Sequence, residues 1–291
     1  MEKIPCPFRG CATALVTPFK GGEVDYGALG SLIDFQIDKG IDAIVVLGTT
    51  GEAPTISEDE RYKIIEFSKR KINDRVPLIV GTGTNSTQST VRYSKNAHSL
   101  GANALLCVSP YYNKPSEGGL INHYSELASS VSLPIILYNV PSRTGVNISL
   151  NVYKALERFS NIVGIKEASG NISYLEDIIC NLKDRYYIYT GNDDLAFVTL
   201  ALGGAGVISV ASNALPDKMH ELCMRFFEGE SQKSREIQLE LLPLIRELFK
   251  ETNPIPVKCA LEILGLIDGE IRPPLYPSQR KSELSNILKS L

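Results

Sequence analysis

The chain has 291 residues, 43% of them hydrophobic, and its formal net charge is −3 at pH 7. One large core is possible at this size, because α/β barrels commonly reach it as a single unit. The small net charge argues against binding to nucleic acid or to an anionic membrane surface. The first ten residues lack the apolar core of a signal peptide, and no apolar stretch is long enough to span a membrane. We therefore expect a soluble, cytoplasmic protein.

Eight short apolar runs follow one another through the first two-thirds of the chain. Each run is nearly continuous in hydrophobic residues, which is typical of parallel strands that are buried on both faces. The runs begin near Cys11, Asp42, Pro77, Asn103, Pro134, Ile162, Tyr186 and Gly206.

Helical patterns fill the intervals between these runs. Asp25 is expected to cap a helix that ends at Gly40, and Ser57 with Glu60 has the spacing of a capping box. A further helix is predicted over residues 89–100, and Asp193 is expected to cap another.

The alternation of strands and helices predicts right-handed parallel crossovers. Eight such strand–helix units match an α/β fold of the (β/α)8 TIM-barrel type. An open, doubly wound sheet is the alternative, but it would usually carry a GxGxxG turn where this chain has Val16-Thr17-Pro18-Phe19. We expect residues 1–215 to hold the barrel strands and most barrel helices. Residues 216–291 would form the last barrel helix and a C-terminal helical extension.

Lys166 ends the sixth run, where a barrel of this type would have its active site. Lysine is almost never fully buried without a partner, so an ion pair with a carboxylate is one explanation. The other is chemical. Burial lowers the pKa of a lysine from about 10.4, in documented cases to about 5–6, and a neutral amine can form an imine with a keto acid.

Other runs end in hydroxylated, aromatic or cationic residues. Gly48-Thr49-Thr50-Gly51 can bind a carboxylate, although such a turn can also be purely structural. Tyr112 and Tyr138 can relay protons or simply pack as aromatic rings. Arg143 can bind a second carboxylate or lie solvated at the surface. Their common position at strand ends favours a functional site.

A metal site is not expected. The three histidines are far apart, and the six cysteines are scattered without a CxxC pair.

Four segments resemble the dihydrodipicolinate synthase family, a group of pyruvate-dependent class I aldolases. They are GTTGE at 48–52, PYYNKP at 110–115, YNVPSRTG at 138–145 and GIKEA at 164–168, in the family's order and at similar spacing. The resemblance extends over essentially the whole chain. It implies a lyase that condenses pyruvate with L-aspartate 4-semialdehyde in lysine and diaminopimelate biosynthesis. It also implies that no metal or organic cofactor takes part, because a lysine imine carries the chemistry.

The resemblance implies roles for individual residues. Lys166 would form the imine, while Thr49, Tyr112 and Tyr138 would relay protons. Because Tyr112 reaches into the neighbouring subunit's site in this family, a tight homodimer, usually within a tetramer, is implied. The residues implied in substrate binding are Thr49, Thr50, Arg143, Gly191 and Ile208.

The chain departs from the family pattern in one respect. Lysine-inhibited relatives carry histidines soon after GTTGE and a glutamate in the helix after the GTG turn. Here residues 53–61 contain no histidine and Ser89 stands in place of the glutamate, although Asn85 and Tyr111 remain. We expect weak or absent inhibition by lysine.

Two alternatives stay open. A lyase for N-acetylneuraminate or a 2-keto-3-deoxy sugar acid would share the barrel and the lysine, but Arg143 and the paired threonines suit a short acidic aldehyde better. A non-catalytic barrel that senses a keto acid would not need a nucleophilic lysine. Lys258 is the next lysine to consider, but it falls in the predicted helical extension.

Overall fold

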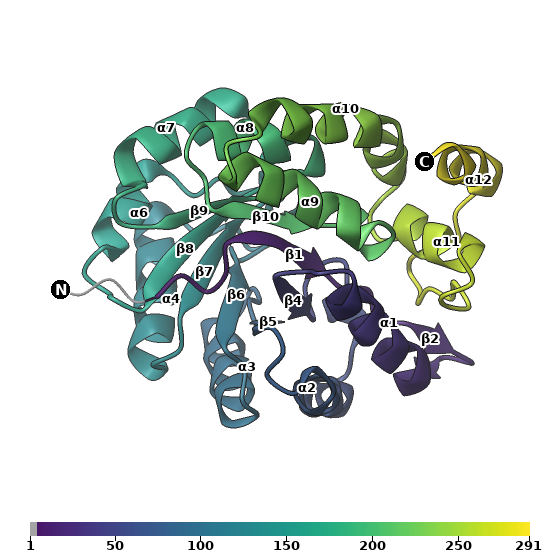
Figure 1. Ribbon diagram of the computed structural model, residues 1–291. Coiled ribbons are helices and arrows are strands. Elements are labelled where there is room, and N and C mark those ends of the chain that lie inside the picture. Colours follow the sequence, from purple (N-terminus) through teal and green to yellow (C-terminus); the bar gives the residue numbers. More distant parts are fainter. Residues whose placement is uncertain (1–4) are drawn as a thin grey trace.

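A closed barrel of eight parallel strands forms the centre of the protein in the computed structural model, which describes residues 5–291 (Figure 1). Around the barrel the strands follow the order β1-β10-β9-β8-β7-β6-β5-β4, and β1 closes the ring by pairing with both β10 and β4. The predicted TIM barrel is confirmed, and the open sheet is excluded. The barrel strands are β1 (Gly10–Ala14), β4 (Ala43–Val46), β5 (Leu78–Gly81), β6 (Ala104–Val108), β7 (Ile135–Asn139), β8 (Ile162–Glu167), β9 (Tyr187–Thr190) and β10 (Gly206–Ser209).

Helices cover the outside of the barrel and continue past its last strand (Figure 1). One apolar cluster fills the space between strands and helices, and a second fills the barrel interior. None of the helices in residues 5–291 is long and apolar enough to cross a bilayer. The helices are α1 (Tyr26–Asp38), α2 (Glu58–Ile72), α3 (Thr87–Ser99), α4 (Glu117–Ser130), α5 (Pro141–Thr144), α6 (Leu150–Leu156), α7 (Ile172–Leu182), α8 (Ala196–Ala201), α9 (Pro216–Phe227), α10 (Ser231–Leu248), α11 (Ile255–Ile263) and α12 (Lys281–Ser290).

The predicted helix starts are partly confirmed. Asp25 caps α1 by accepting from the Ala28 N–H, and Ser57 forms a complete capping box with Glu60 at the start of α2. The helix predicted over residues 89–100 begins earlier, at Thr87, because Ser86 supplies the cap. The division of the chain at residue 215 stays a prediction.

Asp193 does not cap a helix, so this prediction was wrong. Residue 193 begins a 3-10 turn (Asp193–Leu195), and its buried carboxylate accepts the N–H groups of Val210 and Ala211 at 3.0 and 2.9 Å. The side chain therefore ties the loop after β9 to the loop after β10. Burial raises the pKa of Asp193, while the nearby Lys166 charge acts in the opposite direction.

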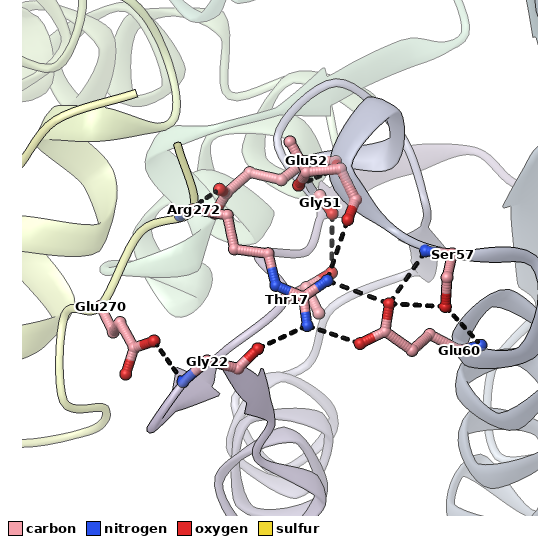
Figure 2. A network of polar contacts seen from close by, with 9 residues as sticks. Thr17, Gly22, Gly51, Glu52, Ser57, Glu60, Glu270 and Arg272 are labelled. Carbon is pink, nitrogen blue, oxygen red and sulfur yellow. Dashed lines mark hydrogen bonds and ion pairs between the residues drawn. The ribbon is translucent and has the colours of Figure 1, made fainter. Parts of the chain in front are cut away.

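The C-terminal extension lies beside a small hairpin that the sequence patterns did not predict, β2 (Phe19–Lys20) and β3 (Glu23–Val24) (Figure 1). Arg272 connects the two segments: its guanidinium donates to the Gly22 carbonyl at 2.7 Å and binds the Glu60 carboxylate (Figure 2). Glu270 accepts the Gly22 N–H at 2.7 Å. These contacts hold the C-terminal extension against the β2–β3 hairpin and the start of α2.

Candidate active site

A cavity of about 160 Å³ opens among the loops that follow the barrel strands. An adjoining cavity of about 220 Å³ shares Thr49, Tyr138 and Arg143 with it and extends to Arg61 and Tyr111. The first cavity is the one that Lys166 lines, together with Thr49, Thr50, Tyr138, Arg143 and Gly191. The structure therefore brings most of the predicted site residues together.

Lys166 lies on β8, a strand in which every residue is buried, and only 5% of Lys166 is exposed. Strand register sets it directly beside Tyr138 of β7, and its Nζ lies 4.3 Å from the centre of the Tyr138 ring. In the described part of the chain, no carboxylate oxygen lies within 4.0 Å of this Nζ. An ion pair does not explain the burial of Lys166.

Glu167 follows Lys166 but is directed into different surroundings, as neighbouring residues on a strand must be. Its buried carboxylate accepts from Asn139 Nδ2 at 2.8 Å and from the Ser169 N–H at 2.6 Å. Burial raises the pKa of Glu167. These hydrogen bonds connect the ends of β7 and β8 and keep the carboxylate away from the lysine amine.

Gly191 gives the lysine side chain room. A Cβ atom at this position would lie 2.6 Å from Lys166 Cε and 2.7 Å from the Ala168 Cβ, which is too close for any side chain. Ile208 is fully buried in the barrel interior with Tyr138, and it is not among the described residues that line the cavity.

The turn after β4 is held by residues from other parts of the chain. Thr17 donates to the Gly51 carbonyl at 2.8 Å (Figure 2), and Asn253 Nδ2 donates to Thr50 Oγ1 at 3.0 Å. Glu52 adopts a left-handed backbone with φ of 54° and forms a buried ion pair with Lys258. The paired threonines are therefore presented by a turn with little freedom to move.

Arg143 lies on the short helix α5 at the rim of the cavity. One of its N–H groups donates to the Asn253 carbonyl at 3.0 Å. The guanidinium carries further donors, and its side chain is exposed, so a carboxylate entering from solvent can reach it.

Tyr112, like Ile208, does not line the Lys166 cavity, but it lies at the surface of the chain. It is 89% exposed, and it lines neither of the two cavities around Lys166 and Arg61. Asn253 and Phe249, by contrast, line the Lys166 cavity although the sequence analysis did not select them. The only sequence signal near Asn253 was the helix break at Asn253-Pro254.

Within residues 5–291, no group of three His, Cys, Asp or Glu residues is placed to hold a metal ion.

Comparison with known proteins gives one consistent family. The model of the Dihydrodipicolinate synthetase family matches residues 7–291. The 4-hydroxy-tetrahydrodipicolinate synthase of Thermotoga maritima is 46% identical over 288 residues, which cover 97% of this chain and 98% of that protein. The crystal structure of the dihydrodipicolinate synthase from Thermotoga maritima is 45% identical, covers 98% of this chain and 99% of that one, and has a TM-score of 0.96.

A further solved relative carries a ligand. The chloride-inhibited dihydrodipicolinate synthase from Acinetobacter baumannii, complexed with pyruvate, is 43% identical, covers 97% of this chain and 98% of that one, and has a TM-score of 0.94. The family model, the sequence identity and the fold agree, and this chain belongs to the dihydrodipicolinate synthetase family.

Proposed function

We propose that this protein condenses pyruvate with L-aspartate 4-semialdehyde to give 4-hydroxy-tetrahydrodipicolinate, a step of lysine and diaminopimelate biosynthesis. The observation that carries the proposal is Lys166, buried at the mouth of the barrel without a carboxylate within 4.0 Å in the described chain. Family membership and the relative complexed with pyruvate support this substrate.

The reaction begins at the Lys166 amine. In its neutral form the amine attacks the carbonyl carbon of pyruvate, and loss of water leaves a protonated imine. The imine withdraws electrons from the neighbouring methyl group, which loses a proton to give an enamine. The enamine carbon attacks the aldehyde of the second substrate. The amino group of that substrate then attacks the imine carbon, which closes the ring and frees Lys166.

The surrounding residues bind the substrates and carry protons. Thr49 and Thr50 hold the pyruvate carboxylate by hydroxyl and backbone donors, and Arg143 binds the carboxylate of the semialdehyde. Tyr138 lies against the amine and relays protons with Thr49 and Tyr112. Gly191 forms part of the cavity wall beside Lys166, and Ile208 packs with Tyr138 in the barrel interior. A reaction without a metal or an organic cofactor, and a cytoplasmic location, remain predictions.

Tyr112 takes part from the neighbouring subunit of a homodimer, usually within a tetramer. Its exposure and its φ of 73° support this assignment, because a left-handed backbone costs a tyrosine on the order of 1–2 kcal/mol and such strain concentrates at functional sites. Mixing Tyr112→Phe with Lys166→Ala subunits should restore part of the activity that each variant lacks. Verified mixed dimers without any rescue would contradict a shared site.

Borohydride trapping tests the proposed function directly. After incubation with pyruvate and reduction, mass measurement should show one pyruvate-derived adduct per chain, and peptide mapping should place it on Lys166. A protein that forms no adduct would instead be a barrel that only binds a keto acid. If the adduct forms, a comparison of aspartate semialdehyde with sugar-acid substrates separates the synthase from the sister lyases, and turnover of the sugar acids alone would contradict the proposal.

A further inference from the structure

We propose that Asn253 is a positioning residue that fixes the direction of the Thr50 hydroxyl, so that Thr50 donates its hydrogen bond to the carboxylate of pyruvate. This inference rests on the proposed function. Asn253 lies between α10 and α11, is 6% exposed, and lines the same cavity as Lys166. It therefore reaches the site from the C-terminal extension and not from a barrel strand.

In the hydrogen bond between Asn253 and Thr50, the amide is the donor. Asn253 Nδ2 lies 3.0 Å from Thr50 Oγ1, and an amide nitrogen only donates, so the threonine oxygen is the acceptor. A hydroxyl has one hydrogen, which turns toward the available acceptor. Thr50 is 2% exposed, and its hydroxyl donates no hydrogen bond to any residue of the described range. Its hydrogen is thus available to an anion in the cavity, where a charge-assisted bond is strong.

Asn253 also contacts the second group that is proposed to bind a carboxylate. Its backbone carbonyl accepts from the Arg143 guanidinium at 3.0 Å. One residue of the C-terminal extension therefore touches both Thr50 and Arg143. This arrangement couples the spacing of the two carboxylate-binding groups to the docking of one segment.

The other end of the Asn253 amide supports a positioning role. Its Oδ1 is buried and has no hydrogen-bond partner in the part of the chain that the structure describes. An unsatisfied buried acceptor destabilises the fold, so the amide is kept for its donor side despite this cost.

Two substitutions at residue 253 separate this role from packing. Asn253→Asp has nearly the same shape, but an ionised carboxylate only accepts, so it would take the Thr50 hydrogen and place a negative charge beside the pyruvate carboxylate. Asn253→Ala leaves the hydroxyl free to turn toward pyruvate. We expect Asn253→Asp to raise the pyruvate concentration for half-maximal imine formation by about 10- to 100-fold, and Asn253→Ala by only a few-fold.

The relative size of the two effects on the half-saturating pyruvate concentration tests the positioning role of Asn253. A packing role predicts the reverse, with the truncation more harmful than the isosteric change, and this order or equal effects would overturn the proposal. Imine formation needs pyruvate alone. A wild-type protein without imine would therefore reject the proposed function, whereas a normal wild type with the reversed order would reject only the role of Asn253.

A second measurement does not depend on the aspartate variant. In a Thr50→Val background there is no hydroxyl to direct, so Asn253→Ala should cause no further change in the half-saturating pyruvate concentration. Additive effects of the two substitutions would show that Asn253 acts independently of Thr50 and would also overturn the proposal.

Discussion

Two lysines are buried in the described part of the protein, and their surroundings differ. Lys166, at the mouth of the barrel, has the Tyr138 ring beside its amine and no carboxylate within 4.0 Å among residues 5–291. Lys258, on α11, forms an ion pair with the buried Glu52 and donates to the Glu270 carbonyl at 2.8 Å. The bonding needs of Lys258 are met by the protein, whereas the Lys166 amine has no such ion pair in the described chain and lines a cavity.

The comparison shows that a perturbed pKa alone does not identify a reactive amine. Burial lowers the pKa of Lys258 to about 8, the direction expected of a nucleophilic lysine. Its Nζ nevertheless lies 4.0 Å from the centre of the Phe19 ring, and Lys258 lines neither of the two cavities at the barrel mouth. The contacts of the amine and its access to a cavity decide between the two lysines.

The largest expected effect is the loss of imine formation when Lys166, but not Lys258, is replaced. Lys166→Met should abolish the reducible pyruvate adduct and lower kcat by on the order of 10³-fold or more, because the nucleophile is lost. Lys258→Met is the matched control and should retain the adduct. Mass measurement after borohydride reduction checks both variants. An adduct that maps to Lys258 would reverse the assignment.

The same two variants should differ in stability in the opposite order, with Lys258→Met the more affected. Lys258→Met leaves Glu52 buried without its partner and should lower the free energy of unfolding by about 3–5 kcal/mol. Lys166→Met breaks no ion pair and should change the free energy of unfolding little. Urea unfolding measures both.

The double variant Lys258→Met/Glu52→Gln removes the uncompensated charge and should recover part of the loss. Equal stability of the single and double variants would mean that the ion pair is not the cause.

The pH dependence of stability tests the network around the C-terminal extension. The Arg272 hydrogen bond lowers the pKa of Glu60 to about 2 from its ordinary value of 4.5. The ionised form is therefore favoured in the folded state, and the stability it contributes is present above about pH 4.5 and lost as the pH falls toward 2. As the pH falls from 4.5 to 2, the free energy of unfolding of wild type should decrease by up to about 3 kcal/mol more than that of Glu60→Gln.

Glu66→Gln, at an exposed position of the same helix, is the control and should retain the wild-type profile. Parallel acid-unfolding curves for wild type and Glu60→Gln would count against the proposed role of the pair.

The smallest effect concerns free lysine added to the enzyme. Activity should change little across millimolar lysine, as the sequence analysis predicts. Arg61 lines the cavity that adjoins the Lys166 cavity, and its guanidinium donates to the Ala53 carbonyl at 2.9 Å. Its positive charge disfavours the binding of cationic lysine in that cavity. Strong inhibition in a steady-state assay would contradict this prediction.

The sequence was sufficient where local patterns carry the information. Buried parallel strands are continuous apolar runs, so the eight strands and the strand-end position of Lys166 could be read directly. The β2–β3 hairpin could not, because strands of two residues have no periodicity. Asp193 has the local features of a helix cap, but its partners lie on the next barrel loop.

Long-range contacts account for the rest of the site. Asn253 and Thr50 are 203 positions apart, and nothing in either segment indicates that they meet. The surroundings of Tyr112 in the proposed dimer depend on a second chain, which a pattern within one chain does not describe.

The docking of the segment around Asn253 also bears on how the protein assembles. All eight strands and Lys166 precede residue 210, whereas the contacts to Thr50 and Arg143 come from residue 253. We expect closure of the barrel and maturation of the substrate site to be separate stages of folding. A nascent chain could thus acquire its scaffold before it becomes able to engage a keto acid.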